Sequence, residues 1–272
     1  MTFCDLHTHS HFSDGTDSPA RLVELARERG LSAIALCDHN TVGGLPEFLA
    51  AAAEGTGIEA VPGCEFTTNR CGTELHILGL FIQPERYGQV ETLLADFTRR
   101  KNENTLELLE ALDRGGYHLD KDAVLARGNG WINRAHVASA LRDAGYVPTV
   151  QAAFDSLLAP GGGFYVPPMP IGSLEAIRFI RSIGAVPVLA HPFLQLDEAG
   201  MRAFLPAAKE AGLAGMEVRY PKYGPETTAL ASRMAKEFGL VPSGGSDYHG
   251  ATKPNPLGLP QVPADWLEAL RP

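Results

Sequence analysis

The sequence contains few cysteines, and patterns that would indicate several common protein classes are missing from it. Four of its 272 residues are cysteine, none of them in a C-x-x-C pair, so nothing demands disulfides and we expect a reducing compartment, the cytoplasm. Cys4, Cys37 and Cys64 lie in apolar runs, which favours small buried core residues. Neither G-x-S-x-G nor a P-loop occurs, which disfavours a serine nucleophile and P-loop nucleotide chemistry.

Long apolar runs are missing as well. No stretch of about 18 residues is apolar enough to span a membrane. The first residues lead directly into a predicted strand, without the basic and apolar regions of a secretion signal. We therefore expect neither a membrane span nor a cleaved leader.

Positive charge is scarce. The chain has 23 basic and 32 acidic residues, for a net charge of −9. This balance disfavours a protein that coats long nucleic acids through phosphate contacts alone. A small phosphorylated substrate stays compatible with it, because bound divalent cations would dominate the field of a pocket. No protein partner is indicated.

Apolar segments of strand length alternate with helical segments along most of the chain. An apolar content of 44% over 272 residues suits one large domain, and an α/β barrel fits this length. The predicted strands are 3–7, 31–37, 58–62, 75–81, 185–190, 215–219 and 240–243. The predicted helices between them are 18–29, 45–54, 173–183, 197–211 and 225–238. This pattern predicts an α/β barrel of seven parallel strands.

One stretch departs from the alternation. Between 90 and 164 the pattern predicts helices at 90–114, 134–144 and 149–158 and no convincing strand. We therefore assign 1–89 and 165–272 to the barrel, and 90–164 to a helical insertion that covers one side of the barrel mouth. The alternative is that these are ordinary barrel helices with weak strands between them.

Histidines and carboxylates gather at the ends of the predicted strands. Active sites of parallel barrels lie at the carboxyl ends of the strands, so these side chains are expected to converge. Imidazole and carboxylate together suit Zn²⁺, Mn²⁺ or Fe²⁺, and the set is too large for one ion. The predicted metal ligands are His7, His9, Asp14, His39, Glu65, His76, His191, Asp247 and His249.

Each predicted ligand also has a structural alternative. His7 and His9 share one face of a strand, where two buried histidines without partners would be costly. Asp14 lies in a Ser-Asp-Gly turn that it could simply stabilise. Glu65 could bridge two ions or form a salt bridge, and His76, in the middle of a strand, could be a core residue.

Asp38 and His39 are adjacent, and we predict different roles for them. His39 is taken as the ligand. Asp38 is taken as the carboxylate that orients its ring, because a ligating histidine usually donates its other nitrogen to such a group.

These residues resemble the PHP (polymerase and histidinol phosphatase) family. The resemblance spans the whole chain and rests on His7-Thr8-His9-Ser10, Ser13-Asp14-Gly15, Asp38-His39, Gly63-Cys64-Glu65, His76, His191-Pro192 and Ser246-Asp247-Tyr248-His249. It implies a distorted seven-stranded β/α barrel with three divalent ions, Mn²⁺ first and Fe²⁺ or Zn²⁺ as alternatives. It also implies a first ion on His7, His9, Glu65 and Asp247, a second on Glu65, His76 and His191, and a third on Asp14, His39 and His249.

The insertion resembles that of stand-alone family members that act on nucleotides. The resemblance implies a phosphoric monoester hydrolase that removes the 3′-phosphate of nucleoside 3′,5′-bisphosphates, such as adenosine 3′,5′-bisphosphate, to give AMP and phosphate. A 5′-to-3′ exoribonuclease or oligonucleotide hydrolase and a histidinol-phosphate phosphatase are alternatives on the same centre. A non-catalytic scaffold is disfavoured because every expected ligand position is filled, and the arginines of the insertion argue mildly against amide or ester hydrolysis.

For catalysis we expect a metal-bound hydroxide as the nucleophile, with no covalent step on the protein. The predicted catalytic residues are Asp38, His191, Asp247 and His249. Arg134 is the first candidate for binding substrate phosphate, because a guanidinium can hold two oxygens at once. The other candidates are Asn102, Arg178, Arg100 and Lys222.

Overall fold

A computed structural model describes residues 2–55, 57–128, 132, 134–159, 164 and 171–272, apart from the side chains of 96–98, 100 and 101. Its strands are β1 (Phe3–Thr8), β2 (Ala33–Leu36), β3 (Glu59–Arg70), β4 (Thr73–Leu80), β5 (Ile171–Gly172), β6 (Val186–Leu189), β7 (Gly215–Arg219), β8 (Val241–Gly244) and β9 (Val262–Pro263). Its α-helices are α1 (Pro19–Glu28), α2 (Leu45–Ala53), α3 (Tyr87–Arg114), α4 (Lys121–Ala126), α5 (Arg134–Asp143), α6 (Val150–Asp155), α7 (Ser173–Ser182), α8 (Glu198–Glu210), α9 (Pro225–Glu237) and α10 (Ala264–Leu270). Short 3-10 turns are η1 (Pro84–Arg86), η2 (Pro192–Leu194) and η3 (Gly250–Thr252).

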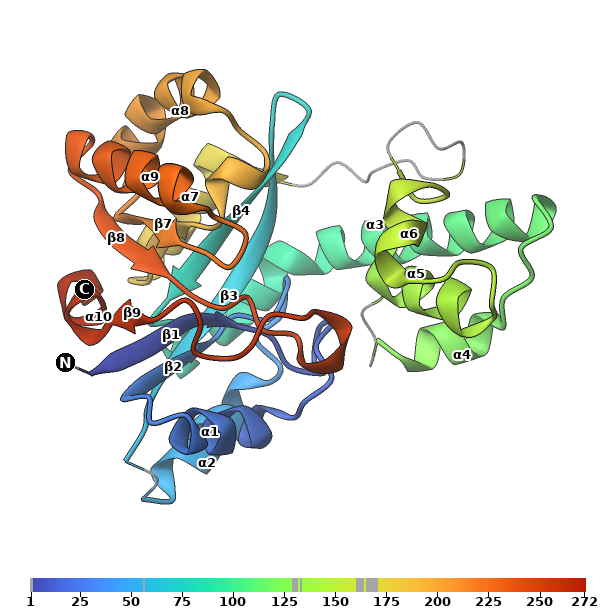
Figure 1. Ribbon diagram of the computed structural model, residues 1–272, viewed down its shortest axis with the longest axis horizontal. Coiled ribbons are helices and arrows are strands. Elements are labelled where there is room, and N and C mark those ends of the chain that lie inside the picture. Colours follow the sequence, from blue (N-terminus) through green and yellow to red (C-terminus); the bar gives the residue numbers. More distant parts are fainter. Residues whose placement is uncertain (1, 56, 129–131, 133, 160–163, 165–170) are drawn as a thin grey trace.

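The strands form one curved sheet (Figure 1). Their order is β8-β7-β6-β4-β3-β2-β1-β9, with β5 beside β3. The sheet almost closes on itself, because Thr8 at the end of β1 bridges to Tyr248 after β8, and the His9 amide donates to the Tyr248 carbonyl at 2.9 Å. The fold is therefore a distorted α/β barrel, as the sequence predicts. It contains all seven predicted strands and, in addition, the two-residue strands β5 and β9.

The expectation that every strand is parallel is wrong for β4. This strand runs antiparallel to both of its neighbours, β3 and β6. Only Cys71 and Gly72, both with positive φ, separate the end of β3 from the start of β4. A link of two residues can make a hairpin but cannot make the long crossover that a parallel pair needs.

β3 is also longer than predicted. It continues through Gly63 and Glu65 to Arg70, so Glu65 lies inside the strand and not after its end. Pro62-Gly63 has the composition of a strand end, but here the glycine permits close contact. A Cβ at Gly63 would lie 2.9 Å from Cys37 Sγ of the neighbouring segment.

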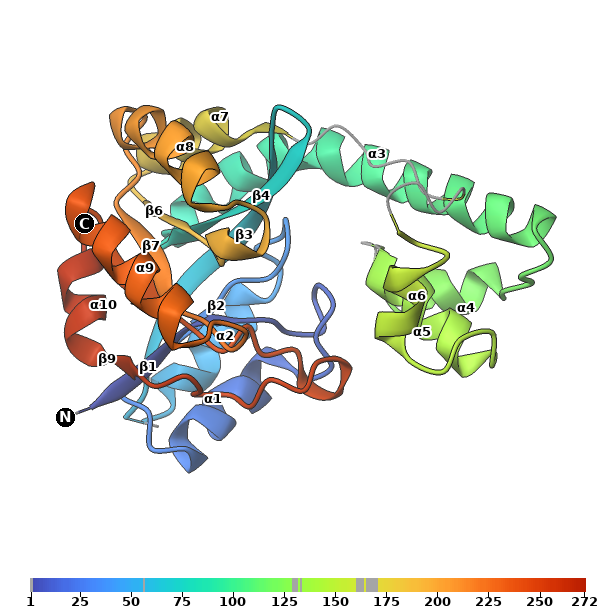
Figure 2. The ribbon, with the colours of Figure 1, turned by 45° about the horizontal axis from the view of Figure 1, so that its top comes forward.

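Two apolar layers hold the barrel together. The inner layer includes Cys4, Leu6 and Cys37, which point into the barrel and are fully buried. The outer layer lies between the sheet and its covering helices, with α1 and α2 against one side and α7, α8 and α9 against the other (Figures 1 and 2). The prediction that Cys4, Cys37 and Cys64 are buried is confirmed.

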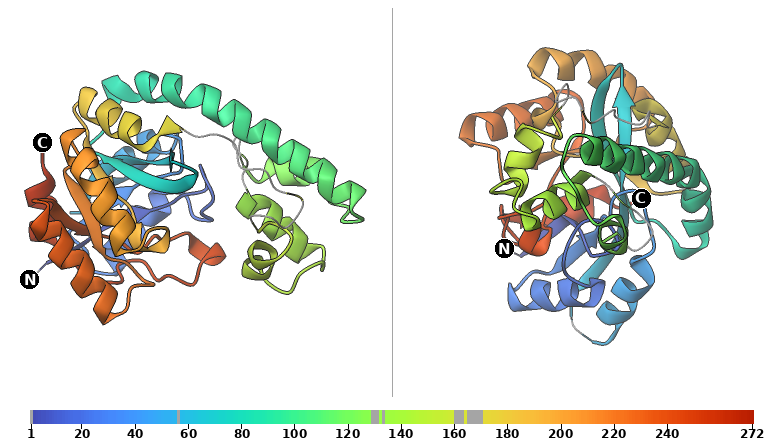
Figure 3. Two further views of the ribbon diagram at one scale, coloured as in Figure 1. Left: turned by 90° about the horizontal axis from the view of Figure 1, so that it is seen from above. Right: turned by 90° about the vertical axis from the view of Figure 1, so that its right-hand side faces the viewer.

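Helices α3–α6, which we call the helical insertion, project from the barrel (Figures 2 and 3). The start of α3 packs on the barrel through Val90 and Leu94, whereas Leu108, Leu109 and Leu112 near its end join a separate apolar cluster with α4, α5 and α6. One 28-residue helix thus belongs to both parts, and it begins before the predicted boundary at 90. Helix α4, capped by Asp120, was not predicted from the sequence. No helix within the described ranges is long and apolar enough to cross a membrane.

Candidate active site

The structure brings all nine predicted metal ligands together at the mouth of the barrel. They reach this point from β1 and the loop after it, from the segment after β2, from the interiors of β3 and β4, and from the segments after β6 and β8. In four overlapping groups, ligand atoms lie within 4.8 Å of one another. The groups are His7, Glu65 and His191; His7, His9 and Asp247; His39, Glu65 and His76; and His9, Asp14, His39 and His249.

The Glu65 carboxylate lies at the centre of the cluster. Its Oε1 is 2.8 Å from His76 Nδ1 and 3.0 Å from His191 Nε2. Its Oε2 is 3.1 Å from His39 Nδ1 and 3.3 Å from both His7 Nε2 and His9 Nε2. The two oxygens thus face two different sets of imidazoles, which is the geometry that a carboxylate bridging two ions requires.

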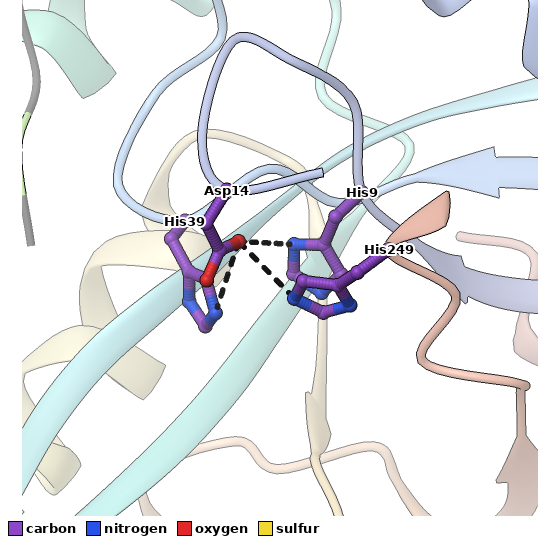
Figure 4. A group of neighbouring side chains, drawn as sticks. All are labelled: His9, Asp14, His39 and His249. Atoms are coloured by element: carbon purple, nitrogen blue, oxygen red, sulfur yellow. Dashed lines mark ion pairs between the residues drawn. The ribbon is translucent and has the colours of Figure 1, made fainter. Parts of the chain in front are cut away.

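A second carboxylate, Asp14, faces three imidazoles on the other side of His9 (Figure 4). Its Oδ1 lies 3.1 Å from His249 Nε2, 3.9 Å from His39 Nε2 and 4.0 Å from His9 Nδ1. The rings of His9 and His249 lie with centroids 4.0 Å apart and are tilted by 30°. Compared with the predicted third set, this group gains His9, which faces two groups at once.

Asp247 has one oxygen in the cluster and one outside it. Oδ1 lies 3.2 Å from His9 Nε2 and 3.4 Å from His249 Nδ1. Oδ2 accepts hydrogen bonds from the Tyr220 hydroxyl at 2.8 Å and from Lys253 Nζ at 2.9 Å. These two donors fix the carboxylate so that Oδ1 points at the imidazoles. Neither contact was predicted from the sequence.

Glu217, which the sequence analysis also missed, supports two of the predicted ligands. It is fully buried in β7, its Oε1 lies 3.0 Å from His7 Nδ1, and its Oε2 accepts from the His191 amide at 2.7 Å. A carboxylate on the far nitrogen of a ligating histidine fixes the tautomer and the orientation of the ring. The available signal was an acidic residue between two apolar residues of a predicted strand, Met216 and Val218.

The predicted role of Asp38 needs correction. Its carboxylate accepts hydrogen bonds from the Ser10 amide at 2.7 Å, from Ser10 Oγ at 2.6 Å and from Ser13 Oγ at 2.6 Å. The ring nitrogens of His39 face Glu65 and Asp14. Asp38 therefore orders the loop that carries Asp14, because the serines of that loop supply the donors that satisfy its buried charge.

The cluster has the properties of a metal site. Among the described residues, the buried atoms His7 Nε2, both nitrogens of His9, His249 Nε2 and Glu65 Oε2 have no hydrogen-bond partner. Burying so many polar atoms without partners would be costly. Ions at about 2.1 Å from each ligand would place ligand atoms about 3 Å apart, close to the separations seen here. The residues present thus fit divalent ions.

The ionisation states of the cluster differ from group to group. Burial opposes the ionisation of Glu65, but His39, His76 and His7 hold the pKa of its carboxyl well below the ordinary value. Burial, reinforced by the nearby His249, lowers the pKa of His9 well below that of a free histidine. An ionised carboxylate and a neutral imidazole are the forms that bind divalent ions. Burial opposes protonation of His7 and His76, but Glu65 raises the pKa of both, that of His76 to about 10, so these two rings would release a proton on binding an ion.

Backbone strain occurs at the same place. His191 and Asp247 have φ of 27° and 48°, and Asn40, next to His39, has φ of 51°. Side chains disfavour this region, so such residues persist where their surroundings hold them. Here the His191 amide is held by Glu217 and the Asp247 carboxylate by Tyr220 and Lys253.

The predicted phosphate-binding residues are more dispersed. Arg134 is the first residue of α5 and is half-buried, with its guanidinium 5.8 Å from the centroid of the Phe154 ring. Asn102 on α3 accepts from the Ile132 amide at 3.0 Å, which brings it near the start of α5. Both belong to the helical insertion.

The other three candidates differ in position. Arg178 lies on the exposed face of α7, whose opposite face packs on the barrel, so the structure does not bring it to the cluster. Lys222 is exposed in the turn after β7. The side chain of Arg100 lies outside the described residues.

Comparison with known proteins identifies a matching family model and several similar proteins. The family model described as PHP domain matches residues 5–151. A 5'-3' exoribonuclease of Haemophilus influenzae is 34% identical over 97% of this chain and 92% of its own length. A phosphoribosyl 1,2-cyclic phosphate 1,2-diphosphodiesterase of Eggerthella lenta is 31% identical over 90% and 94%. A 3',5'-nucleoside bisphosphate phosphatase of Chromobacterium violaceum is 30% identical over 92% and 88%.

A solved structure shows the same architecture. A proposed metal-dependent phosphoesterase from Bifidobacterium adolescentis superposes with a TM-score of 0.90 at 29% identity, over 99% of this chain and 95% of that one. The fold and the His/carboxylate cluster thus define a metal-dependent hydrolase of phosphoesters. The chain belongs to the PHP domain family.

Proposed function

We propose that this enzyme is a phosphoric monoester hydrolase that removes the 3′-phosphate of nucleoside 3′,5′-bisphosphates. Its centre would hold three divalent ions, with Mn²⁺ as the first candidate for the metal. The observations that support the proposal are that the nine predicted ligands gather at the barrel mouth and that the loops after β1 and β8 extend toward the helical insertion (Figure 2). An insertion on that side can hold the second phosphate of a small substrate while the first reaches the cluster.

The metal-binding residues would be those that the cluster gathers around Glu65 and Asp14. Divalent ions in such a centre supply an activated water at neutral pH and neutralise phosphoryl oxygens. Glu217, Tyr220 and Lys253 would orient these ligands, and the surrounding protein buries most of the cluster away from solvent.

Arg134 would bind the non-reacting 5′-phosphate. A guanidinium can hold two phosphate oxygens, and the half-buried position of this side chain next to Phe154 limits the entropy lost on binding. The relative from Chromobacterium violaceum, which carries the bisphosphate phosphatase name over nearly the same length, supports this substrate class.

A 5′-to-3′ exoribonuclease is the second candidate. The relative from Haemophilus influenzae favours it, with 34% identity over almost the whole chain. Both activities need a metal-ligand cluster and a phosphate-binding group. They differ in the space required, because an exoribonuclease must also accommodate the rest of the RNA chain next to the bond that it cleaves.

The test is a substrate panel on protein whose metals have been measured by elemental analysis. The panel contains adenosine 3′,5′-bisphosphate, 5′-phosphorylated short RNA, histidinol phosphate and p-nitrophenyl phosphate. The proposal expects the highest kcat/KM for the bisphosphate, with AMP and phosphate as products. Mononucleotides released from RNA at a higher kcat/KM would select the exoribonuclease instead, and a metal content well below three ions would contradict the trinuclear centre.

A further inference from the structure

We infer that Lys253 is a phosphate-binding residue of this site. It lies directly after η3, and its ammonium is 2.9 Å from Asp247 Oδ2, the oxygen that faces away from the imidazoles. Its side chain is 38% exposed, whereas that of Asp247 is 4% exposed. The side chain thus runs from solvent to a buried predicted ligand of the cluster, where a phosphoester entering beside Asp247 could meet its ammonium.

The ammonium has donors available for a substrate. A lysine carries three N–H donors, and within the described structure Lys253 donates one hydrogen bond, to Asp247. A phosphoryl oxygen entering next to Asp247 could accept from another. The positive charge would then add to that of the ions on the side of the site that Asp247 occupies, and charge-assisted hydrogen bonds of this kind are the strong ones.

The loop that carries Lys253 is fixed before any substrate binds. The Ala251 amide donates to Thr16 Oγ1 at 3.0 Å, and the single hydroxyl proton of Thr252 is shared between the His249 carbonyl at 3.0 Å and the Asp14 carbonyl at 3.3 Å. These bonds tie the loop after β8 to the loop after β1, which also carries a predicted ligand. The cation is therefore held in place, and little of its binding energy would be spent on ordering the loop.

A purely structural role for Lys253 makes a different prediction. Tyr220 donates to the same oxygen of Asp247 but carries no charge. If Lys253 served only to orient Asp247, removal of either donor would have a similar effect on metal content and on rate. If it binds phosphate, the lysine variant would lose far more than the tyrosine variant at equal metal content.

The experiment compares Lys253→Met, Lys253→Arg and Tyr220→Phe, with Lys236→Met on the exposed face of α9 as the matched control. Metal content is measured for each by elemental analysis, and kcat and KM are measured with p-nitrophenyl phosphate. We expect Lys253→Met to keep its metal and to lose about 100-fold in kcat/KM. We expect Lys253→Arg to recover most of this loss and Tyr220→Phe to lose about 5-fold or less.

Equal losses in Lys253→Met and Tyr220→Phe, or loss of metal in step with activity in Lys253→Met, would overturn the inference in favour of a positioning role. Unchanged kinetics in Lys253→Met would overturn it outright. The inference rests on the proposed function only for its phosphoester chemistry. A bisphosphate that proves to be a poor substrate would defeat the proposed function without changing the result with p-nitrophenyl phosphate.

Discussion

The barrel mouth and the helical insertion place their polar side chains in different ways. At the mouth, separate segments of the barrel bring nine predicted ligands to one point, and the side chains that support them, such as Glu217 and Asp38, are buried. In the insertion, Arg134 lies beside Phe154 and is the first residue of the ten-residue helix α5. The insertion has an apolar cluster of its own, which is distinct from that of the barrel.

This difference suits separate roles for the two parts, with catalysis in the barrel and substrate selection in the insertion. A site fixed by several strands can hold ligand atoms at constant separations, which suits chemistry that needs precise geometry. A helical unit joined to the barrel through α3 can vary in sequence and position without disturbing those separations. The shared phosphoesterase chemistry would then lie in the barrel, and the choice of substrate in the insertion.

The largest effect is expected from Glu65→Gln. An amide cannot supply two anionic oxygens, and five imidazoles face this carboxylate. We expect kcat/KM for every substrate to fall at least about 1,000-fold, together with a lower metal content. Glu59→Gln, on the same strand but paired with Arg271 outside the site, is the control and should stay active. Full metal content and activity in Glu65→Gln would show that the cluster is not the catalytic centre.

A smaller but still large effect is expected from Glu217→Gln. The amide nitrogen cannot accept the hydrogen bond from the His191 amide or from His7, so one of the two ligands loses its support. We expect metal affinity, measured by titration of metal-free protein, to fall about 10- to 100-fold. Excess metal in the assay should restore most of the activity. An unchanged metal affinity would mean that the strands alone fix these ligands.

The convergence of the candidate ligands could be predicted from the sequence because strand ends and alternation are local patterns. His7 and His9 follow from the two-residue period of a strand, and His191 follows an apolar run. The structure adds the distances between them, which no local pattern contains.

The supporting residues could not be predicted, because their roles depend on contacts far apart in the chain. Glu217 reaches His7 across 210 residues, and Asp38 meets serines of a loop 25 to 28 residues before it. A carboxylate between apolar residues of a strand indicates that a polar group lies nearby but does not identify that group. The direction of β4 was missed for a simpler reason, because a two-residue hairpin was treated as a longer connection.

Arg134→Ala tests whether the insertion selects the substrate, because it changes a side chain of the insertion and none of the barrel. If this side chain holds the second phosphate, kcat/KM for adenosine 3′,5′-bisphosphate should fall about 10- to 50-fold, while turnover of p-nitrophenyl phosphate should change less than about 3-fold. Arg127→Ala, which removes a surface ion pair with Asp143, is the control from the same insertion. Equal losses on both substrates in Arg134→Ala would mean that the arginine supports the fold or the centre and does not select the substrate.

The smallest effect on the chemistry is expected from Leu112→Ala. This side chain is fully buried in the apolar cluster of the insertion, and its truncation should destabilise that cluster by about 2–4 kcal/mol. Because the barrel has its own core, metal content and turnover of p-nitrophenyl phosphate should stay near those of the parent protein, while KM for the bisphosphate rises. Leu205→Ala, on the buried face of α8 that packs on the barrel, is the matched truncation. If Leu112→Ala lowered the metal content as much as Leu205→Ala, the insertion and the barrel would form one cooperative unit, and the proposed division between chemistry and substrate choice would fail.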